Sequence, residues 1–266
     1  MNHLLRELAP ITDDAWSEID DEAARALKNF LTGRRLVDFE GPLGWDAAAV
    51  TTGRREPVEI PVGNVYSAAR QSKPLVELRA EFTLSREELD AIERGAKDAD
   101  LDPVVDAARR IALAEDTLVI EGCEAVDIDG IAAGSEHPVI EIGKDYNEFP
   151  TYVVQAVGML RAAGVEGPYA VSLGPVCYKG VTESTEMGNP ILDHLRLITG
   201  GPVFWAPGVN GTLVSSLRGG DYRLIVGEDL SLGYSHADAE SVHLYLEETV
   251  TFSNDSPEAA VALRYP

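Results

Sequence analysis

Histidine is the side chain best suited to metal binding or acid–base catalysis near neutral pH, and this chain has five histidines. They are scattered along the sequence as His3, His137, His194, His236 and His243. None of them has the close His or Cys partner that metal-site spacings require. Asp193 precedes His194 like half of an acid–base pair, but adjacent residues on a helix do not face each other. The sequence therefore predicts no resident metal ion and no cofactor.

Motifs for nucleophilic or nucleotide chemistry are absent as well. There is no G-x-S-x-G elbow, no phosphate-binding Walker loop and no H-E-x-x-H zinc motif. Gly41 and Gly44 do not link a strand to a helix, as the glycines of a dinucleotide site do. Acidic runs such as 20–22 and 247–248 are interpreted as solvated faces, because the chain is rich in carboxylates. A triad assembled only in space would escape this search, so a peptidase stays an alternative hypothesis.

The net charge of −23 at pH 7 over 266 residues restricts the partners of the chain. Nucleic-acid binding needs clusters of Lys and Arg on the phosphates, and the basic pairs here are isolated. No apolar run approaches the roughly 20 residues that span a membrane, and no signal peptide is visible. We therefore expect a cytoplasmic protein that binds neither nucleic acid nor membrane, with Cys123 and Cys177 as reduced thiols.

The C-terminal part of the chain carries the clearest structural pattern. Apolar and polar residues alternate over 222–226 and again over 242–252, and a period of two predicts half-buried strands. The polar and glycine-containing segments 219–221 and 235–238 predict turns between strands. This region is therefore scaffold, and the question becomes what the protein builds.

Two segments nearer the N-terminus predict elements that need a partner surface. Residues 13–33 form an amphipathic helix that Thr12 or Asp13 caps. Its apolar stripe consists of Trp16, Ile19, Ala23, Leu27 and Phe30. Residues 51–74 contain three prolines and two glycines and predict a long extended hairpin that cannot bury itself. Such an arm is unusual inside a compact domain but is sensible across a neighbouring subunit.

The middle of the chain predicts helices followed by an α/β unit. Residues 85–122 read as two helices separated near Gly95, the second one beginning at Asp102-Pro103. Residues 123–227 read as a separate α/β unit. Its predicted elements are helices near 148–163, 175–182 and 190–198 and strands at 169–173, 203–205, 212–217 and 222–226.

Six segments spread along essentially the whole chain match one protein family in the same order. They are LLRELAPITDDAWSEIDDEAARALKNFLTGRRLVDFEGPLGW (4–45), PLVELRAEFTLSREELDAIERG (74–95), AEDTLVIEGC (114–123), GVEGPYAVSLG (164–174), RGGDYRLIVGEDLSLGY (218–234) and LYLEETVTF (244–252). In these segments the chain resembles the family 1 encapsulins, the shell proteins of bacterial nanocompartments, also called the linocin or bacteriocin-like family.

This resemblance implies an α+β fold like that of the phage Hong Kong 97 capsid protein, with a peripheral domain, an apical domain and an extended arm. The implied division is the N-terminal helix and start of the peripheral domain at 1–44, the arm (E-loop) at 45–75, the peripheral domain with its spine helix at 76–124, the apical domain at 125–226 and the peripheral-domain sheet at 227–266.

The resemblance also implies a function. Family members self-assemble into a closed icosahedral shell, which requires sixty copies or a multiple of sixty. The shell encloses a cargo enzyme, a dye-decolourising peroxidase or a ferritin-like protein, which connects the family to oxidative stress and iron storage. A short C-terminal targeting peptide of the cargo docks between the N-terminal helix and the sheet. By position, the residues implied are Leu27, Phe30, Leu31, Arg34 and Asp38 on the helix side and Leu230, Leu232 and Tyr234 on the sheet side.

Passage through the shell and contacts between its subunits are implied at two further places. The loop 182–190 would line a pore at the fivefold axis, where Glu183, Glu186 and Asn189 would form polar rings that favour cations. Sixty copies would carry roughly 1,400 negative charges, so assembly needs compensating contacts. The basic residues of the arm that we expect to make them are Arg54, Arg55, Arg70 and Lys73.

A major capsid protein of a phage or prophage shares the implied fold and is the second hypothesis. The long N-terminal helix favours an encapsulin, because phage capsid proteins generally begin differently. The sequence thus predicts a structural protein in the first place, with the capsid protein and the peptidase as alternatives.

Overall fold

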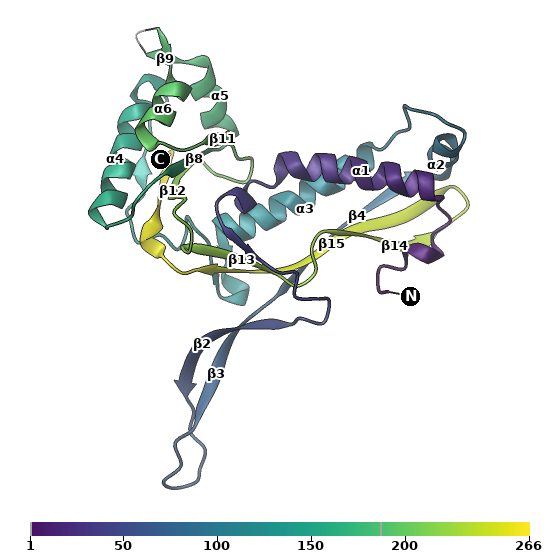
Figure 1. Cartoon of the computed structure of the whole chain (residues 1–266), viewed down its shortest axis with the longest axis horizontal. Coiled ribbons are helices and arrows are strands. Elements are labelled where there is room, and N and C mark those ends of the chain that lie inside the picture. Colours follow the sequence, from purple (N-terminus) through teal and green to yellow (C-terminus); the bar gives the residue numbers. More distant parts are fainter. Residues whose placement is uncertain (1, 187) are drawn as a thin grey trace.

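The computed structural model describes residues 2–186 and 188–266, and at position 186 it describes the backbone only. The chain forms a long sheet covered by helices, a smaller α/β unit, and a two-stranded hairpin that projects away from both (Figure 1). None of the helices among these residues combines the length and the apolar character of a membrane-spanning segment.

β15 (Ser241–Asn254) is the central strand of the long sheet. On one side it pairs with β4 (Val76–Ser85) over most of its length. On the other side it pairs with β14 (Ser231–Ala237) and then with β13 (Tyr222–Val226), which holds the short parallel strand β1 (Asp38–Glu40). The two stretches of alternating residues are therefore strands, as the sequence predicts.

Helices α1 (Asp13–Phe30) and α3 (Asp102–Ile120) lie side by side over one face of this sheet, and α2 (Arg86–Glu93) follows β4 at its end (Figure 1). The hydroxyl of Thr12 accepts a hydrogen bond from the amide of Ala15, which confirms the predicted N-terminal cap of α1. The apolar stripe of α1, apart from Phe30, packs with α3 and the sheet in one core.

Helix α1 is shorter than the sequence predicts. It ends at Phe30 rather than Gly33, and the chain continues into a single 3-10 turn, η2 (Gly33–Arg35). The buried Asp116 of α3 causes this early end, because its carboxylate accepts hydrogen bonds from the amides of Thr32 (3.1 Å) and Gly33 (2.7 Å). These amides are thereby satisfied outside a helix.

The smaller unit contains a five-stranded sheet in the order β11, β8, β12, β16, β7. The bounds of these strands are β7 Ile140–Glu141, β8 Tyr169–Leu173, β11 Val203–Trp205, β12 Thr212–Ser216 and β16 Ala260–Arg264. Three helices pack on it, α4 (Phe149–Ala162), α5 (Pro175–Glu183) and α6 (Ile191–Thr199). The predicted helices and strands of this region are thus present within two residues of their expected bounds.

Two strands lie in a different sheet from the one that the predicted division gives them. β13 falls in the range 125–226 but pairs with β15 and β1 in the long sheet. β16 falls in the range 227–266 but pairs with β12 in the smaller sheet. Short buried strands carry no sign of their partner, because pairing is set by contacts distant in sequence. The division into peripheral and apical domains stays a prediction.

The remaining described elements are short. They are η1 Arg6–Leu8, β5 Gly122–Cys123, η3 Glu124–Val126, β6 Ile128–Asp129, η4 Tyr146–Glu148, β9 Thr185–Glu186, β10 Asn189–Pro190 and η5 Pro257–Ala259. Cys123 is half-buried and Cys177 is buried, and both are free thiols.

The projecting hairpin consists of β2 (Ala49–Pro57) and β3 (Ala68–Pro74), which pair with each other and with no other described strand (Figure 1). Almost all of its residues are exposed. Its tip exposes the large apolar side chains Val58, Ile60, Val62, Val65 and Tyr66. A two-stranded hairpin is at best marginally stable alone in water, so this one needs another surface.

The carboxylates of Glu247 and Glu248 are fully buried, which corrects their interpretation as a solvated face. They lie in β15, which has a strand on each side. Successive residues of a strand point to opposite faces, so the two carboxylates are buried in different surroundings. Glu248 lies on the helix-covered face near Arg34, and Glu247 lies on the opposite face near Arg79.

Candidate functional site

An apolar groove separates helix α1 from the edge strand β14 of the long sheet. It encloses about 230 Å³. Its lining residues are Leu4, Arg6, Asp20, Ala23, Ala24, Leu27, Leu230, Ser231, Leu232 and Leu246. The groove is narrow and apolar along its walls and polar at one end, which suits a short extended peptide with small or branched apolar side chains.

One wall of the groove is a helix, and the other is formed by two strands. Ala23 and Leu27 stand four residues apart on the same face of α1. Leu232 of β14 and Leu246 of β15 are direct cross-strand partners. The small side chains of Ala23 and Ala24 keep the helix wall low, so the leucines of the sheet form the floor.

An ion pair between Arg6 and Asp20 closes the polar end of the groove. The guanidinium makes two hydrogen bonds to the carboxylate, of 2.9 and 2.7 Å, and lies 4.0 Å from the centre of the Trp16 ring. Two parallel hydrogen bonds fix the orientation of both side chains. Both groups are therefore held in place to meet a polar ligand atom.

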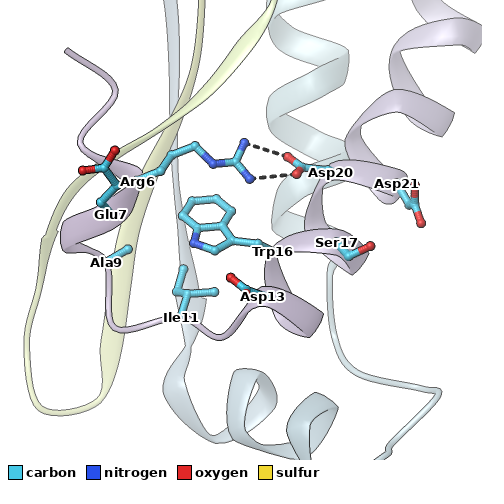
Figure 2. Close-up of a pocket in the computed structure, with 9 residues that line it drawn as sticks. All are labelled: Arg6, Glu7, Ala9, Ile11, Asp13, Trp16, Ser17, Asp20 and Asp21. Carbon is cyan, nitrogen blue, oxygen red and sulfur yellow. Dashed lines mark hydrogen bonds and ion pairs between the residues drawn. The ribbon is translucent and has the colours of Figure 1, made fainter. Parts of the chain in front are cut away.

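A second and more open hollow of about 500 Å³ lies on the far side of this ion pair (Figure 2). Arg6 reaches across from the N-terminal segment to Asp20, and the indole of Trp16 lies between the segment and the helix (Figure 2). Arg6 and Asp20 line both hollows, so the ion pair is the boundary between them.

The chain's own N-terminal segment forms one side of the groove. Leu4 is buried there, and its carbonyl oxygen accepts a hydrogen bond of 2.8 Å from the amide of Tyr234 in β14. The hydroxyl of Tyr245 donates to the carbonyl oxygen of His3 at 3.4 Å. Part of the free edge of β14 is therefore occupied by residues 3 and 4, as an added strand would occupy it.

The structure brings together three of the eight residues that the resemblance assigns to peptide docking. Leu27, Leu230 and Leu232 line the groove directly. Tyr234 lies two residues after Leu232 in β14, and its backbone amide donates to the N-terminal segment. The role of these residues in binding a peptide stays a prediction.

The other four assigned residues lie away from the groove. The ring of Phe30 lies near Trp205 of β11, with centroids 6.0 Å apart. Leu31 caps the end of α1, and its amide donates to the carbonyl oxygen of Leu27. Asp38 accepts a hydrogen bond of 2.6 Å from the amide of Gly220. These side chains are engaged with their own chain rather than with the groove.

Arg34 is the centre of a buried ion network and not a free anchor. Its guanidinium lies 2.6 Å from Glu115, 3.0 Å from Glu248 and 2.9 Å from Asp229. Burial alone would lower the pKa of Arg34, but the hydrogen bond and charge of Glu115, helped by the other two carboxylates, raise it. Burial and the charge of Glu115 raise the pKa of Glu248 well above its ordinary value. Arg34 therefore joins η2 to α3 and β15.

Sequence reasoning missed several lining residues. Leu246 continues the alternation of β15, and Asp20 and Ala24 flank the recognised stripe of α1, so a helical and a strand period could have nominated them. Leu4 and Arg6 gave no such signal, because nothing in the sequence shows that the N-terminal segment returns to β14.

The residues assigned to a pore lie at the tip of the smaller unit, at the end of α5 and on the short hairpin of β9 and β10 that follows it (Figure 1). Glu183 and Asn189 are exposed there. The side chain of Glu186 lies outside the described residues. One chain contains no symmetry axis, so the pore and its cation preference stay predictions.

The basic residues assigned to subunit contacts are in the projecting hairpin or at its base. Arg54, Arg55 and Arg70 are exposed and form no ion pair within the described part of the chain, and Arg55 faces Arg70 across the two strands. Lys73 differs, because it is half-buried and donates to the carbonyl oxygen of Phe252 at 3.4 Å. Three of the four basic groups are thus available to another molecule.

One cluster among the described residues has metal-ligand chemistry, namely His3 with Glu228 and Glu247. It lies on the face of the long sheet away from α3. The spacing argument from the sequence could not detect it, because its members are far apart in the chain.

Comparison with known proteins gives consistent matches over the whole chain. Residues 1–251 match the model of the Linocin_M18 family, described as "Encapsulating protein for peroxidase". The chain is 48% identical over 263 residues to a type 1 encapsulin shell protein of Mycolicibacterium paratuberculosis, which covers 99% of both chains. It is 49% identical over 271 residues to one of Rhodospirillum rubrum, which covers 99% of this chain and 97% of that protein.

Solved structures with a similar fold are capsids and capsid-like particles. A virus-like particle protein from Pyrococcus furiosus superimposes with a TM-score of 0.66 at 15% identity, covering 92% of this chain and 98% of that one. A protein of Mycobacterium phage Bobi gives a TM-score of 0.53 at 15% identity, covering 100% and 94%. At these identities the likeness concerns the fold alone.

Proposed function

The chain belongs to the family of encapsulin shell proteins, and from this premise we propose that it assembles into a closed shell that encloses a cargo enzyme held in the groove between α1 and β14. The α+β capsid-like fold that the resemblance implies is confirmed. The relatives are structural shell proteins, so the role of this chain is not enzymatic and the chemistry belongs to a separate cargo.

The proposed occupant of the groove is the C-terminal targeting peptide of the cargo. The apolar groove carries this proposal, since its walls include Leu27, Leu230 and Leu232 and its end holds a fixed arginine–carboxylate pair. A peptide with two or three small or branched apolar side chains fills such walls, and its backbone can meet Arg6 and Asp20. The family description names a peroxidase, so a dye-decolourising peroxidase is the proposed cargo and a ferritin-like protein is the second.

Cargo loading tests the groove directly. The shell protein is co-expressed with a fluorescent protein that carries the C-terminal tail of a peroxidase encoded beside the shell gene. Leu27→Ser and Leu230→Ser should lower the fluorescence recovered per particle at least tenfold. Lys28→Ser is the matched control, since Lys28 neighbours Leu27 but is exposed on the helix. Equal loading of all variants in intact particles would exclude the groove as the docking site.

The proposed interface between subunits includes the β2–β3 hairpin. Its exposed apolar tip and its three exposed arginines, which form no ion pair among the described residues, fit the surface of a neighbouring acidic chain. Sixty copies or a multiple of sixty form the proposed icosahedral shell, and we propose that this nanocompartment lies in the cytoplasm.

The proposed passage for ions is formed by the end of α5 and the β9–β10 hairpin, where copies of Glu183 and Glu186 would form rings of negative charge around the fivefold axis. Glu183→Gln/Glu186→Gln should slow the entry of ferrous ions into particles without changing the entry of a neutral dye. Stopped-flow measurements on particles loaded with an iron-sensitive indicator give both rates. Equal ferrous entry in the variant and the parent would contradict this assignment.

A further inference from the structure

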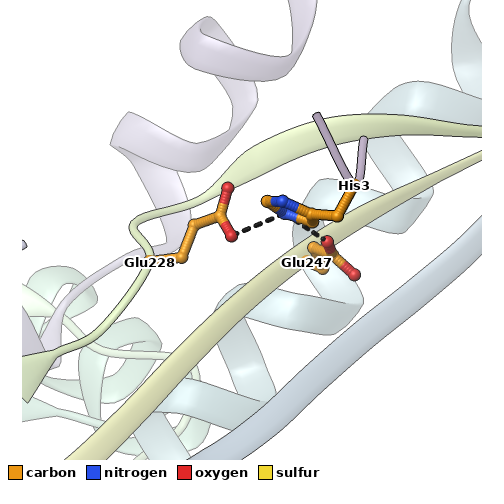
Figure 3. Close-up of side chains that lie close together, drawn as sticks. All are labelled: His3, Glu228 and Glu247. Atoms are coloured by element: carbon orange, nitrogen blue, oxygen red, sulfur yellow. Dashed lines mark ion pairs between the residues drawn. The ribbon is translucent and has the colours of Figure 1, made fainter. Parts of the chain in front are cut away.

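Three side chains from distant parts of the chain meet on the face of the long sheet opposite α3 (Figure 3). His3 comes from the N-terminal segment, Glu228 from the connection between β13 and β14, and Glu247 from β15. The Nε2 atom of His3 lies 2.7 Å from Oε2 of Glu228 and 3.3 Å from Oε1 of Glu247. All three atoms lie within 4.8 Å of one another.

These three atoms lack other partners. Nε2 of His3, Oε2 of Glu228 and Oε1 of Glu247 are each buried without a hydrogen bond of acceptable geometry in the described part of the chain. The side chain of Glu247 is only 1% exposed, so water cannot freely solvate its oxygen. An unmet carboxylate oxygen in such surroundings is costly, so this cluster favours a positive charge that both carboxylates can contact.

The surroundings hold the three groups in position. The imidazole of His3 stacks on the indole of Trp45, with ring centroids 3.8 Å apart and planes 10° from parallel. Arg79 donates to the other oxygen of Glu247, with Nε at 3.0 Å. Contacts of this kind fix the orientation of ligands in metal sites. Arg79 balances only one of the two carboxylates, so with a neutral imidazole the cluster is short of one positive charge.

We propose that His3, Glu228 and Glu247 bind one divalent transition-metal ion of the zinc or cobalt(II) type. One imidazole nitrogen and two carboxylate oxygens form a ligand set for these ions, whereas magnesium and calcium take oxygen ligands. Tetrahedral ligands at about 2.0–2.2 Å from an ion stand about 3.3–3.6 Å apart. His3 and Glu247 already have this separation. His3 and Glu228 must separate by about 0.6 Å, and water completes the fourth position.

The consequence for the fold is a fastening of the N-terminal segment. His3 lies on one face of the sheet, and the next residue, Leu4, lines the groove on the helix side. An ion that joins His3 to β15 therefore holds the segment around the free edge of β14. Ion binding at this cluster does not depend on cargo docking, so the two proposals can fail separately.

Cobalt(II) and zinc titrations test the site. Full-length protein freed of metal by chelation is titrated with cobalt(II) near neutral pH, in excess magnesium to cover surface carboxylates, and visible absorption reports tetrahedral coordination. Zinc affinity is measured by calorimetry under the same conditions. We expect one site per chain, weakened at least tenfold by His3→Asn and by Glu228→Gln. His236→Asn, which alters a histidine stacked on His243 elsewhere, is the matched control and should change nothing.

Two outcomes would overturn the proposal. Absence of saturable cobalt(II) or zinc binding in the parent protein would leave the cluster as an ion pair between a protonated histidine and two glutamates. Binding that survives both substitutions at unchanged affinity would place the ion elsewhere. Circular dichroism of each variant establishes that its fold is retained. Glu247 is left unchanged in these experiments because it also pairs with Arg79.

Discussion

The helix-covered face of the long sheet and the β2–β3 hairpin both carry several charged side chains. The two regions differ in whether these charges form ion pairs within the chain. On the sheet, the buried carboxylates Glu115 and Glu248 meet Arg34 from the same chain. On the hairpin, Arg54, Arg55 and Arg70 are exposed and form no ion pair among the described residues. The difference teaches that the buried charges of the sheet are neutralised within one chain, whereas the hairpin arginines need a partner that this chain does not supply among the described residues, which is why we propose a neighbouring subunit.

Charge reversal in the hairpin should have the largest effect of the changes considered, because it should prevent the assembly of particles. Arg54→Glu/Arg55→Glu/Arg70→Glu replaces attraction to an acidic neighbour with repulsion, in a chain whose net charge is already −23. We expect loss of most large particles in light scattering, with unchanged secondary structure in circular dichroism.

The matched control reverses three basic groups of α1 and its neighbourhood, Arg25, Lys28 and Lys97, so the change in net charge is the same. These residues are exposed or pair on the surface, and particles of this variant should persist. Particles that persist equally in both triple variants would show that the hairpin arginines do not hold subunits together.

Removal of the central cation of the buried network should have the next largest effect. Arg34→Met leaves Glu115 and Glu248 without their partner and should lower the free energy of unfolding by about 3–5 kcal/mol. Arg223→Met removes a more exposed arginine that also has two carboxylate partners, Glu40 and Asp255, and should cost about 1 kcal/mol or less. Denaturant unfolding followed by tryptophan fluorescence compares them, and similar costs would contradict the burial of the first network.

A smaller effect is expected from pH. Burial raises the pKa of Asp116 to about 6, against the hydrogen bonds from Thr32 and Gly33, which lower it. A carboxyl with a raised pKa in the folded chain keeps its proton where the unfolded chain has lost it. Its contribution to the free energy of unfolding is therefore fully present below about pH 4 and decreases by up to about 3 kcal/mol as the pH rises through 6.

Asp116→Asn should remove this pH dependence while lowering stability overall, since an amide cannot accept all the hydrogen bonds that end α1. The measurement is the unfolding midpoint of both proteins between pH 4 and pH 8. Burial would raise the pKa of Asp255, but the hydrogen bond from Arg223 lowers it below its ordinary value, so Asp255 changes stability only below about pH 4, outside this range. Parallel profiles in the two proteins would show that Asp116 does not titrate in this range.

Local patterns predicted much of this structure, and contacts between distant residues account for the parts that they missed. The period of two in β13 and β15, the stripe and cap of α1 and the extended hairpin follow from neighbouring residues. The burial of Glu247 and Glu248 does not follow from neighbouring residues. Charged residues are expected at the surface, but these two lie in a central strand that has a partner strand on each side.

The same limit applies to the candidate sites. Of the residues that the resemblance assigns to docking, Leu27, Leu230 and Leu232 line one groove, whereas Arg34 lies in a buried ion network. The return of the N-terminal segment along β14 was invisible in the sequence. It places Leu4 in the groove and His3 beside Glu247, so both proposed sites depend on a backbone path that no short motif encodes.

Electron microscopy of particles loaded with the tagged cargo tests the central claim most directly. A reconstruction should show closed hollow particles in which each β2–β3 hairpin lies on a neighbouring subunit and each groove between α1 and β14 faces the interior with peptide density along Leu27, Leu230 and Leu232. Particles whose grooves open to the exterior or stay empty despite loading, with hairpins that touch no neighbour, would contradict it.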